Sequence, residues 1–221
     1  MLSWLDRNWY FMWRKEAGVL KRLKEMPLVS GLLVVINILV FIACTVTGER
    51  LYDAGMMDVQ GVLGQKEYGR LLWSMFLHAG TGHIFNNMLI LFFLGAMIEK
   101  EIGHIRFSFL YFLSGLSGSL LSLYVKVWNG DMSGSVGASG AIFGLDGVLL
   151  SMVLFRGRQM ENVTPPRVLL MILLSLYSGY TSGNVDNAAH IGGLLAGFAA
   201  GSVMCIAQKK KNRSQEASGE H

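Results

Sequence analysis

The stretch LVSGLLVVINILVFIACTVT, residues 28–47, is a run of 20 residues without a charged side chain. An α-helix of about 20 apolar residues is long enough to cross the hydrocarbon core of a bilayer. The whole chain has a matching composition, because 52% of its 221 residues are hydrophobic and 15% are charged. Soluble domains carry about 25% charged residues, and the mean hydropathy here is +0.43. The sequence therefore predicts a membrane protein with a first span over 28–47.

Five more apolar runs follow the first span. They lie at roughly 84–98, 107–127, 139–155, 167–180 and 188–207. Several are shorter than a spanning helix requires, so we expect the helices to extend into the flanking loops. Pro165 and Pro166 mark the start of the fifth run, where proline is tolerated at the beginning of a helix. The predicted fold is an all-α membrane protein, a bundle of six transmembrane helices without an internal repeat.

The distribution of positive charge predicts the orientation of these spans. Of the 19 Lys and Arg residues, 15 lie before the first span, between spans 2 and 3, between spans 4 and 5, or after span 6. Cytoplasmic loops carry such an excess, so both termini are predicted to be cytoplasmic. The net charge of +4 then reflects topology and not a nucleic-acid surface. The charged, Trp-rich first residues lack the pattern of a cleavable signal peptide, which favours a bacterial inner membrane over an organelle.

The chain divides into three predicted regions. Residues 1–26 form either an amphipathic helical leader at the membrane interface or a poorly ordered leader with an aromatic anchor. Residues 27–207 hold the six spans, and 208–221 form a polar, basic cytoplasmic tail that we expect to be disordered. The loop over 48–82 is the longest between spans and should contain structure of its own. Its apolar stretch LWSMFL, 72–77, should be partly buried.

Four polar residues fall at one depth in the predicted membrane. Spans 2, 4 and 6 all begin on the outer side, and His83, Asn87, Ser139 and His190 lie near these beginnings. Polar side chains inside a membrane are costly and tend to mark functional sites. A serine together with histidines supplies the groups of nucleophilic catalysis.

Each of these residues also has a structural explanation. Ser139 is small enough to serve as a packing residue between helices, and His190 can donate a hydrogen bond to a neighbouring helix. Gly193 and Gly197 form a G-x-x-x-G pattern that permits close helix approach. That approach is either purely structural or the means by which His190 reaches Ser139.

No metal or other cofactor is predicted. His78 and His83 could ligate a metal, but no acidic or cysteine partner stands at a suitable spacing nearby. Cys44 and Cys205 lie far apart inside spans, without the spacing of a zinc site or of a secreted disulfide framework. We interpret both cysteines as small apolar residues.

Three motifs resemble those of one known family. GASG at 137–140, HAGTGHIFNN at 78–87 and AAHIGGLLAG at 188–197 resemble the rhomboid intramembrane serine proteases. The motifs occur in the order of that family and on the expected spans, and the resemblance covers roughly residues 28–207. It implies a six-helix bundle of rhomboid type with a partly structured long first loop.

The resemblance also implies roles for individual residues. Ser139 would be the nucleophile and His190 its general base, in a dyad without an acid. His83, Asn87 and the backbone N–H of Ser139 would hold the oxyanion. The supporting residues that it implies are His78, Gly137, Gly140, Phe143, Gly193, Gly197, Arg70 and Glu99.

The sequence departs from the family pattern at several positions. Glu67 and Arg70 match a Glu-x-Trp-Arg element of the first loop, but Gly69 stands where the family has Trp, and Trp73 is the nearby residue that could take over its packing. Phe143 replaces the tyrosine often found beneath the catalytic histidine, which keeps the flat ring and removes a hydroxyl.

Two aspartates lie close to the implied site. Asp146 falls two turns below Ser139 on nearly the same helix face, about 10 Å away. We predict that it is a buried hydrogen-bond partner between helices and not a catalytic acid. Asp186 precedes the sixth span and is predicted to cap it.

The function predicted is that of an intramembrane serine endopeptidase. It would cleave single-span or membrane-anchored proteins near the outer end of their transmembrane segment, within the lipid bilayer and without nucleic acid. One alternative is a catalytically silent rhomboid-like protein that binds membrane clients. Another is a small transporter or proton pathway through His83, Asp146, Glu99 and His190. Transporter folds often contain inverted internal repeats, and this sequence shows no repeat. The sequence leaves the oligomeric state open.

Overall fold

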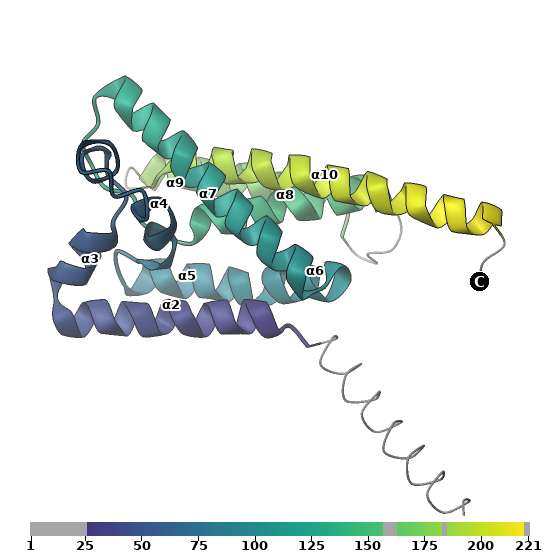
Figure 1. Cartoon of the computed structure of the whole chain (residues 1–221), viewed down its shortest axis with the longest axis horizontal. Coiled ribbons are helices and arrows are strands. Elements are labelled where there is room, and N and C mark those ends of the chain that lie inside the picture. Colours follow the sequence, from purple (N-terminus) through teal and green to yellow (C-terminus); the bar gives the residue numbers. More distant parts are fainter. Residues whose placement is uncertain (1–25, 157–162, 183–184, 219–221) are drawn as a thin grey trace, which may run out of the picture.

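The computed structural model describes residues 26–156, 163–182 and 185–218 of the chain (Figure 1). This described part is helical and contains no β-strand. The predicted leader over 1–26 lies outside it, apart from Met26. The helical elements are α2 (Leu28–Thr47), α3 (Glu49–Gly55), the π-helical turn η1 (Gln60–Gly64), α4 (Arg70–Trp73), the 3-10 turn η2 (Ser74–Phe76), α5 (Thr81–Ile90), the π-helical turn η3 (Leu91–Gly95), α6 (Ala96–Ile102), α7 (His104–Asn129), α8 (Ser139–Arg156), α9 (Pro165–Ser182) and α10 (Asn187–Ser218).

Four helical stretches of the described chain are long and apolar enough to cross a membrane. They are α2, the continuous run Thr81–Ile102 formed by α5, η3 and α6, then α7, and Asn187–Gln215 of α10. The apolar part of α8, Ser139–Phe155, is shorter. Helix α2 coincides with its predicted run, and the later helices extend beyond theirs, as expected from the shortness of several of those runs. The all-α membrane fold is thereby confirmed, whereas the count of six spans remains a prediction because neither α8 nor α9 is among these four stretches.

Helix α8 is the centre of the bundle. Residues 140–149 are all buried, and Figure 1 shows α8 and α10 side by side with α7 crossing them. Glycines permit this packing: a Cβ on Gly193 would overlap the carbonyl oxygen of Gly140, and a Cβ on Gly197 would overlap that of Gly144. Close approach of backbones through small residues is the usual way in which membrane helices associate. Because α8 is central, its first residue, Ser139, lies inside the bundle near one end.

The first turn of α2 is capped by a residue from α6. The backbone N–H groups of Val29 and Ser30 donate to the carboxylate of Glu99 at 2.8 Å each, and the Ser30 hydroxyl donates to it at 2.7 Å. His104 Nδ1 lies 2.5 Å from the same carboxylate. The free N–H groups of a helix start need such acceptors. Glu99, which is fully buried, therefore fastens the second predicted span to the first.

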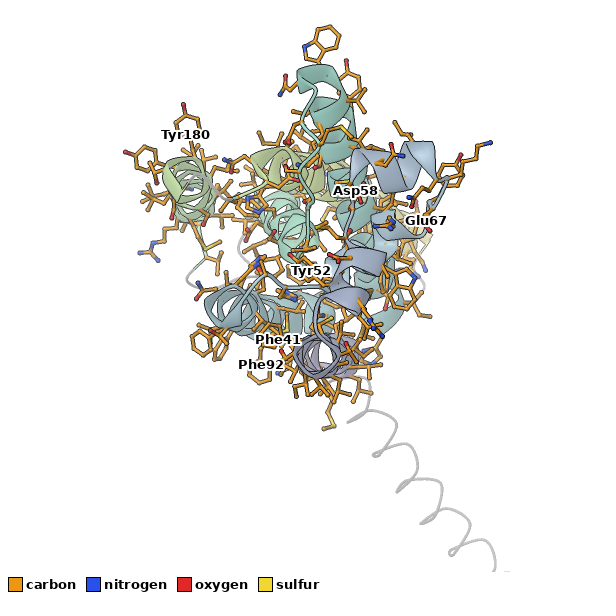
Figure 2. All side chains as sticks on the ribbon, turned by 90° about the vertical axis from the view of Figure 1, so that its left-hand side faces the viewer. Phe41, Tyr52, Asp58, Glu67, Phe92 and Tyr180 are labelled. Atoms are coloured by element: carbon orange, nitrogen blue, oxygen red, sulfur yellow. The ribbon has the colours of Figure 1, made fainter. Side chains whose placement is uncertain are left out.

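The long first loop is partly structured, as predicted, and Arg70 is its hub. Its Nε donates to Glu67 at 2.6 Å and its Nη1 to Asp58 at 3.1 Å. Nη1 also donates to the backbone oxygens of Asp53 and Met56. Figure 2 shows Asp58 and Glu67 together on this loop. One guanidinium thus ties α3, η1 and α4 into a unit.

The stretch 72–77 of this loop is partly buried, as the sequence indicates. Residues 74–77 are buried, while Leu72 and Trp73 are exposed. A Cβ built on Gly69 would lie 3.6 Å from Cδ1 of Trp73, so the Trp73 ring packs against the Gly69 position.

The expectation of a disordered tail after residue 207 is wrong for most of its length. Helix α10 continues through Ser218. Lys, Arg, Gln and Ala, which make up much of this segment, favour helix. Adding residues to an existing helix also avoids the cost of nucleation.

Candidate active site

Ser139 is the first residue of α8, and the loop before it is held from two sides. Met57 of the first loop and Ser135 form an antiparallel bridge, with N···O distances of 3.1 and 2.8 Å. Gly137 N donates to the Ser74 carbonyl at 2.9 Å. Gly137 has a φ of +128°, a conformation that only glycine adopts without strain. The chain therefore reaches Ser139 in a fixed direction, with the N–H groups of the helix start free.

His190, in the first turn of α10, meets Ser139 directly. His190 Nε2 lies 2.8 Å from Ser139 Oγ, within hydrogen-bonding distance. The imidazole is stacked flat on Phe143, with ring centroids 4.1 Å apart and an angle of 15° between the planes. His190 Nδ1 is buried and has no hydrogen-bond partner in the described part of the chain. The ring is thus oriented by packing on Phe143, and no carboxylate of the described residues bonds to it.

Two nitrogen donors from α5 face the loop before Ser139. A Cβ built on Gly137 would lie 2.9 Å from His83 Nε2 and 3.6 Å from Asn87 Nδ2. His83 Nδ1 accepts a long hydrogen bond, 3.4 Å, from the backbone N–H of Ala79, which leaves the proton on Nε2. Asn87 Nδ2 is buried and has no partner among the described residues. Both N–H groups are therefore available to a group bound beside Ser139.

His78 supports His83 from behind. The two rings meet edge to face, with centroids 5.1 Å apart. Burial, with a smaller contribution from His83, lowers the pKa of His78 from 6.5 to about 4. His78 is thus neutral at physiological pH and packs as an aromatic ring.

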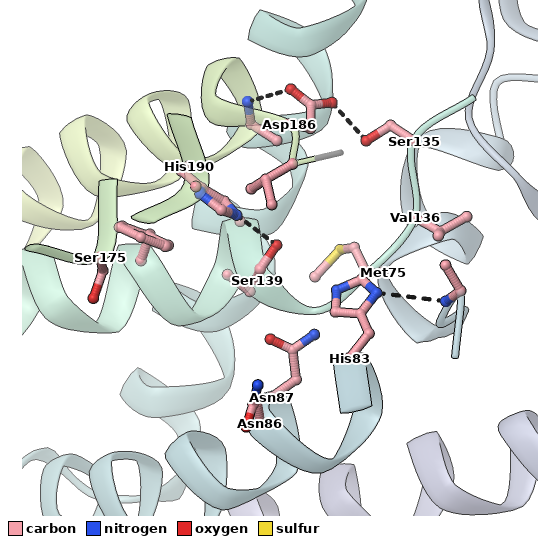
Figure 3. Close-up of a pocket in the computed structure, with 18 of the residues that line it drawn as sticks. Met75, His83, Asn86, Asn87, Ser135, Val136, Ser139, Ser175, Asp186 and His190 are labelled. Carbon is pink, nitrogen blue, oxygen red and sulfur yellow. Dashed lines mark hydrogen bonds between the residues drawn. The ribbon is translucent and has the colours of Figure 1, made fainter. Parts of the chain in front are cut away.

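One cavity of about 750 Å³ is lined by His83, Asn87, Ser139, Phe143 and His190, whereas His78 lies behind His83 and does not line it. Its walls come from α5, from the loop and first turn of α8, from α9 and from the start of α10 (Figure 3). Asn86, Asn87 and His83 lie on one side of Ser139, and Ser175 of α9 lies on another. The cavity is therefore bordered by the helices α5 and α9 as well as by the loops.

Asp186 links three segments at this end of the bundle. Its carboxylate accepts from Ala189 N at 3.0 Å, which caps α10 as predicted. It also accepts from the hydroxyls of Ser135, at 2.6 Å, and of Ser122 in α7. The start of α10 that carries His190 is thereby tied to the loop that leads to Ser139.

The structure does not bring every candidate residue into this cavity. Arg70 organises the first loop and Glu99 caps α2, and neither lines the cavity. Gly140 and Gly193 contribute through the contact of α8 with α10. The proposed interhelical hydrogen bond of Asp146 is not found: its carboxyl is buried, and Oδ1 has no partner in the described chain.

Some residues of the site escape sequence reasoning. Ser122 and Ser135 are ordinary serines in their local context, and their common partner is 64 and 51 residues away. Asn86 and Ser175 line the cavity, and the signal that could have found Ser175 is its polarity within an apolar run. Among the described residues, no group of three His, Cys, Asp or Glu could hold a metal ion.

Comparison with known proteins agrees with the motifs. A family model described as the rhomboid domain matches residues 65–207. The chain belongs to the rhomboid family. It is an integral membrane protein of the all-α, rhomboid type.

Relatives within the rhomboid family come from a bacterium and a plant. Rhomboid protease GluP of Bacillus subtilis is 32% identical over 196 residues, which cover 86% of this chain and 37% of that protein. RHOMBOID-like protein 4 of Arabidopsis thaliana is 42% identical over 159 residues, 71% of this chain and 39% of the relative. YdcA of Bacillus subtilis is 33% identical over 169 residues, 76% of this chain and 77% of that protein. The chain thus spans about two fifths of the length of GluP and of the plant relative.

Proposed function

We propose that this rhomboid is an intramembrane serine endopeptidase that uses a Ser139–His190 dyad. The observation that carries the proposal is the 2.8 Å separation of Ser139 Oγ and His190 Nε2. This pair opens on a cavity that also holds the N–H groups of His83 and Asn87, and that of Asn87 has no partner among the described residues. Helix packing alone requires neither the short Ser139–His190 distance, nor the cavity beside it, nor the donors that face the cavity.

The chemistry follows from these positions. Ser139 Oγ attacks the carbonyl carbon of the scissile peptide bond while its proton passes to His190 Nε2. The oxyanion of the tetrahedral intermediate accepts hydrogen bonds from His83, from Asn87 and from the backbone N–H of Ser139. The intermediate collapses, the C–N bond breaks, and His190 returns the proton to the leaving amine. Water then hydrolyses the acyl-Ser139 ester by the same route.

A dyad without a carboxylate needs another means of holding the histidine. Stacking on Phe143 fixes the plane of the His190 ring, and the Asp186 cap fixes the start of its helix. The positive end of the α8 dipole lies at Ser139 and favours the developing negative charge.

The substrate is a membrane-anchored protein cut near the outer end of its transmembrane segment. The cavity is bordered by α5 and α9, which gives a transmembrane segment a lateral route to Ser139. Fifteen of the 19 Lys and Arg residues on one side of the spans support cytoplasmic termini, so the site faces the outer side of a bacterial inner membrane. Residues 27–207 form the catalytic domain in this proposal, with a leader before it and a basic tail after it.

Covalent labelling of Ser139 tests the nucleophile. A fluorophosphonate reacts with an activated serine hydroxyl and leaves a mass adduct on it. We expect peptide mapping to locate the adduct on Ser139 in the purified protein and to find none in the folded His190→Ala variant. Equal labelling of Ser175, which lines the same cavity, or none at all, would favour a client-binding protein. If the protein is instead a proton pathway, Asp146→Asn should abolish proton transport and leave the fluorophosphonate reaction unchanged.

A further inference from the structure

Another cavity lies at the end of α8 and α10 that is remote from Ser139. Its volume is about 240 Å³, and it is lined by Phe155, Ile206, Lys209, Lys210 and Arg213. The four residues from α10 follow the spacing i, i+3, i+4 and i+7, which places them on one helix face. Phe155 is 16 residues from Ser139, so about 24 Å of helix separates the two cavities.

The basic side chains of this cavity are exposed. Lys209, Lys210 and Arg213 all lie on the surface, and no carboxylate pairs with them among the side chains that the structure describes, which in α10 extend to residue 215. Lys209 and Arg213 stand four residues apart, a spacing at which like charges destabilise a helix. An anion bound between them would remove that repulsion.

The floor of the cavity is apolar. Phe155 is 38% and Ile206 is 53% exposed, although both stand next to the cations. Helix α8 ends at Arg156 while α10 continues to Ser218, so this face of α10 extends past its neighbour. The change from apolar to basic residues falls between Ile206 and Lys209, as at the surface of a membrane.

We infer that this cavity binds the headgroup of an anionic phospholipid. The phosphate would accept hydrogen bonds from Lys209, Lys210 and Arg213, and an acyl chain would lie along Phe155 and Ile206. Basic pockets between membrane helices on the cytoplasmic side are suited to such headgroups. A zwitterionic phospholipid fits less well because its own cation faces the three positive side chains. The lipid would fix the depth of α10 in the membrane, and the inference does not depend on the proposed protease activity.

Lipid binding can be measured on the purified chain in dodecyl maltoside by native mass spectrometry. The probes are dioleoylphosphatidylglycerol, dioleoylphosphatidylcholine with the same acyl chains, and sodium phosphate as the free anion. Arg213→Gln is compared with Lys211→Gln, which removes the same charge two residues away on the same helix and outside the cavity. Lys209→Gln and Ile206→Asn test a second cation and the apolar floor.

We expect a 1:1 adduct with phosphatidylglycerol that phosphatidylcholine does not match. Arg213→Gln and Lys209→Gln should each weaken it about fivefold, Ile206→Asn should weaken it as well, and Lys211→Gln should leave it unchanged. Equal weakening by Lys211→Gln would mean diffuse attraction and no site. Equal retention of phosphatidylcholine, or displacement of the lipid by sodium phosphate at equal concentration, would also overturn the inference.

Discussion

Gly193 of α10 lies so close to Gly140 of α8 that a Cβ on Gly193 would overlap the Gly140 carbonyl oxygen. Gly140 follows Ser139 directly, and Gly193 stands three residues after His190. The contact between these two glycines therefore sets how closely the two proposed catalytic side chains can approach.

Gly193→Ala should separate α8 from α10. The obstructing atom is a backbone oxygen, which cannot turn away as a side chain can, so the helices must move. We expect a loss of about 1–3 kcal/mol in the free energy of unfolding and a fall in cleavage rate on the order of 10²-fold. Gly31→Ala in α2 is the matched control, because no atom lies within 4 Å of a Cβ there. Wild-type cleavage by Gly193→Ala would contradict the account.

Asn87→Ala removes one proposed oxyanion donor. Because that hydrogen bond forms only with the charged intermediate, kcat should fall on the order of 10²-fold, with little change in KM. Asn86→Ala is the matched control, since Asn86 lines the same cavity one residue earlier. Steady-state kinetics on a model substrate separates the two parameters. An effect of Asn87→Ala confined to KM, or matched by Asn86→Ala, would remove Asn87 from the oxyanion site.

Asp186 is expected to act as a positioning residue. Asp186→Ala loses the cap of α10 and the bonds from Ser122 and Ser135, which should cost about 1–2 kcal/mol of stability. Because His190 follows the cap, kcat should fall with KM nearly unchanged, and Asp186→Asn should be intermediate. A double-mutant cycle with Ser135→Ala checks the link. Additive effects of the two substitutions would show that the tether does not exist.

His78 should make stability depend on pH. Its pKa is about 4 in the folded protein because of burial, against 6.5 in its ordinary state. The unfolded chain therefore binds a proton below pH 6.5 that the folded chain binds only near pH 4, so stability is lost as pH falls through this window. His78→Phe should remove up to about 3 kcal/mol of that loss. The check is the free energy of unfolding in mixed micelles at several pH values, and an unchanged slope in the variant would contradict the assignment.

That His83, Asn87, Ser139 and His190 lie near one another could be predicted from sequence, since hydropathy alone places them near the beginnings of alternate predicted spans. The cap by Asp186 was also predictable, because it depends on residues three positions apart. By contrast, its bonds to Ser122 and Ser135 depend on where α7 and the loop before α8 pack, which no local pattern encodes. The prediction of a disordered tail after residue 207 was wrong for a related reason. Composition alone did not show that these residues continue helix α10.

Glu99 and Asp146 also show that the partners of a buried carboxylate cannot be predicted from local sequence. Asp146 lies within a predicted span and Glu99 directly follows one, and both residues are buried. Glu99 meets the backbone N–H groups of the α2 start, whereas Asp146 Oδ1 meets no donor in the described chain. Only the arrangement of neighbouring helices distinguishes the two outcomes.

The most direct test of the account is cleavage of a model single-span protein by the purified chain in liposomes, with product masses measured. Wild type is compared with Ser139→Ala, and Ser175→Ala serves as the control because Ser175 lines the same cavity. The account predicts two product fragments from wild type and from Ser175→Ala, and none from folded Ser139→Ala. Fragments from Ser139→Ala at the wild-type rate would contradict it.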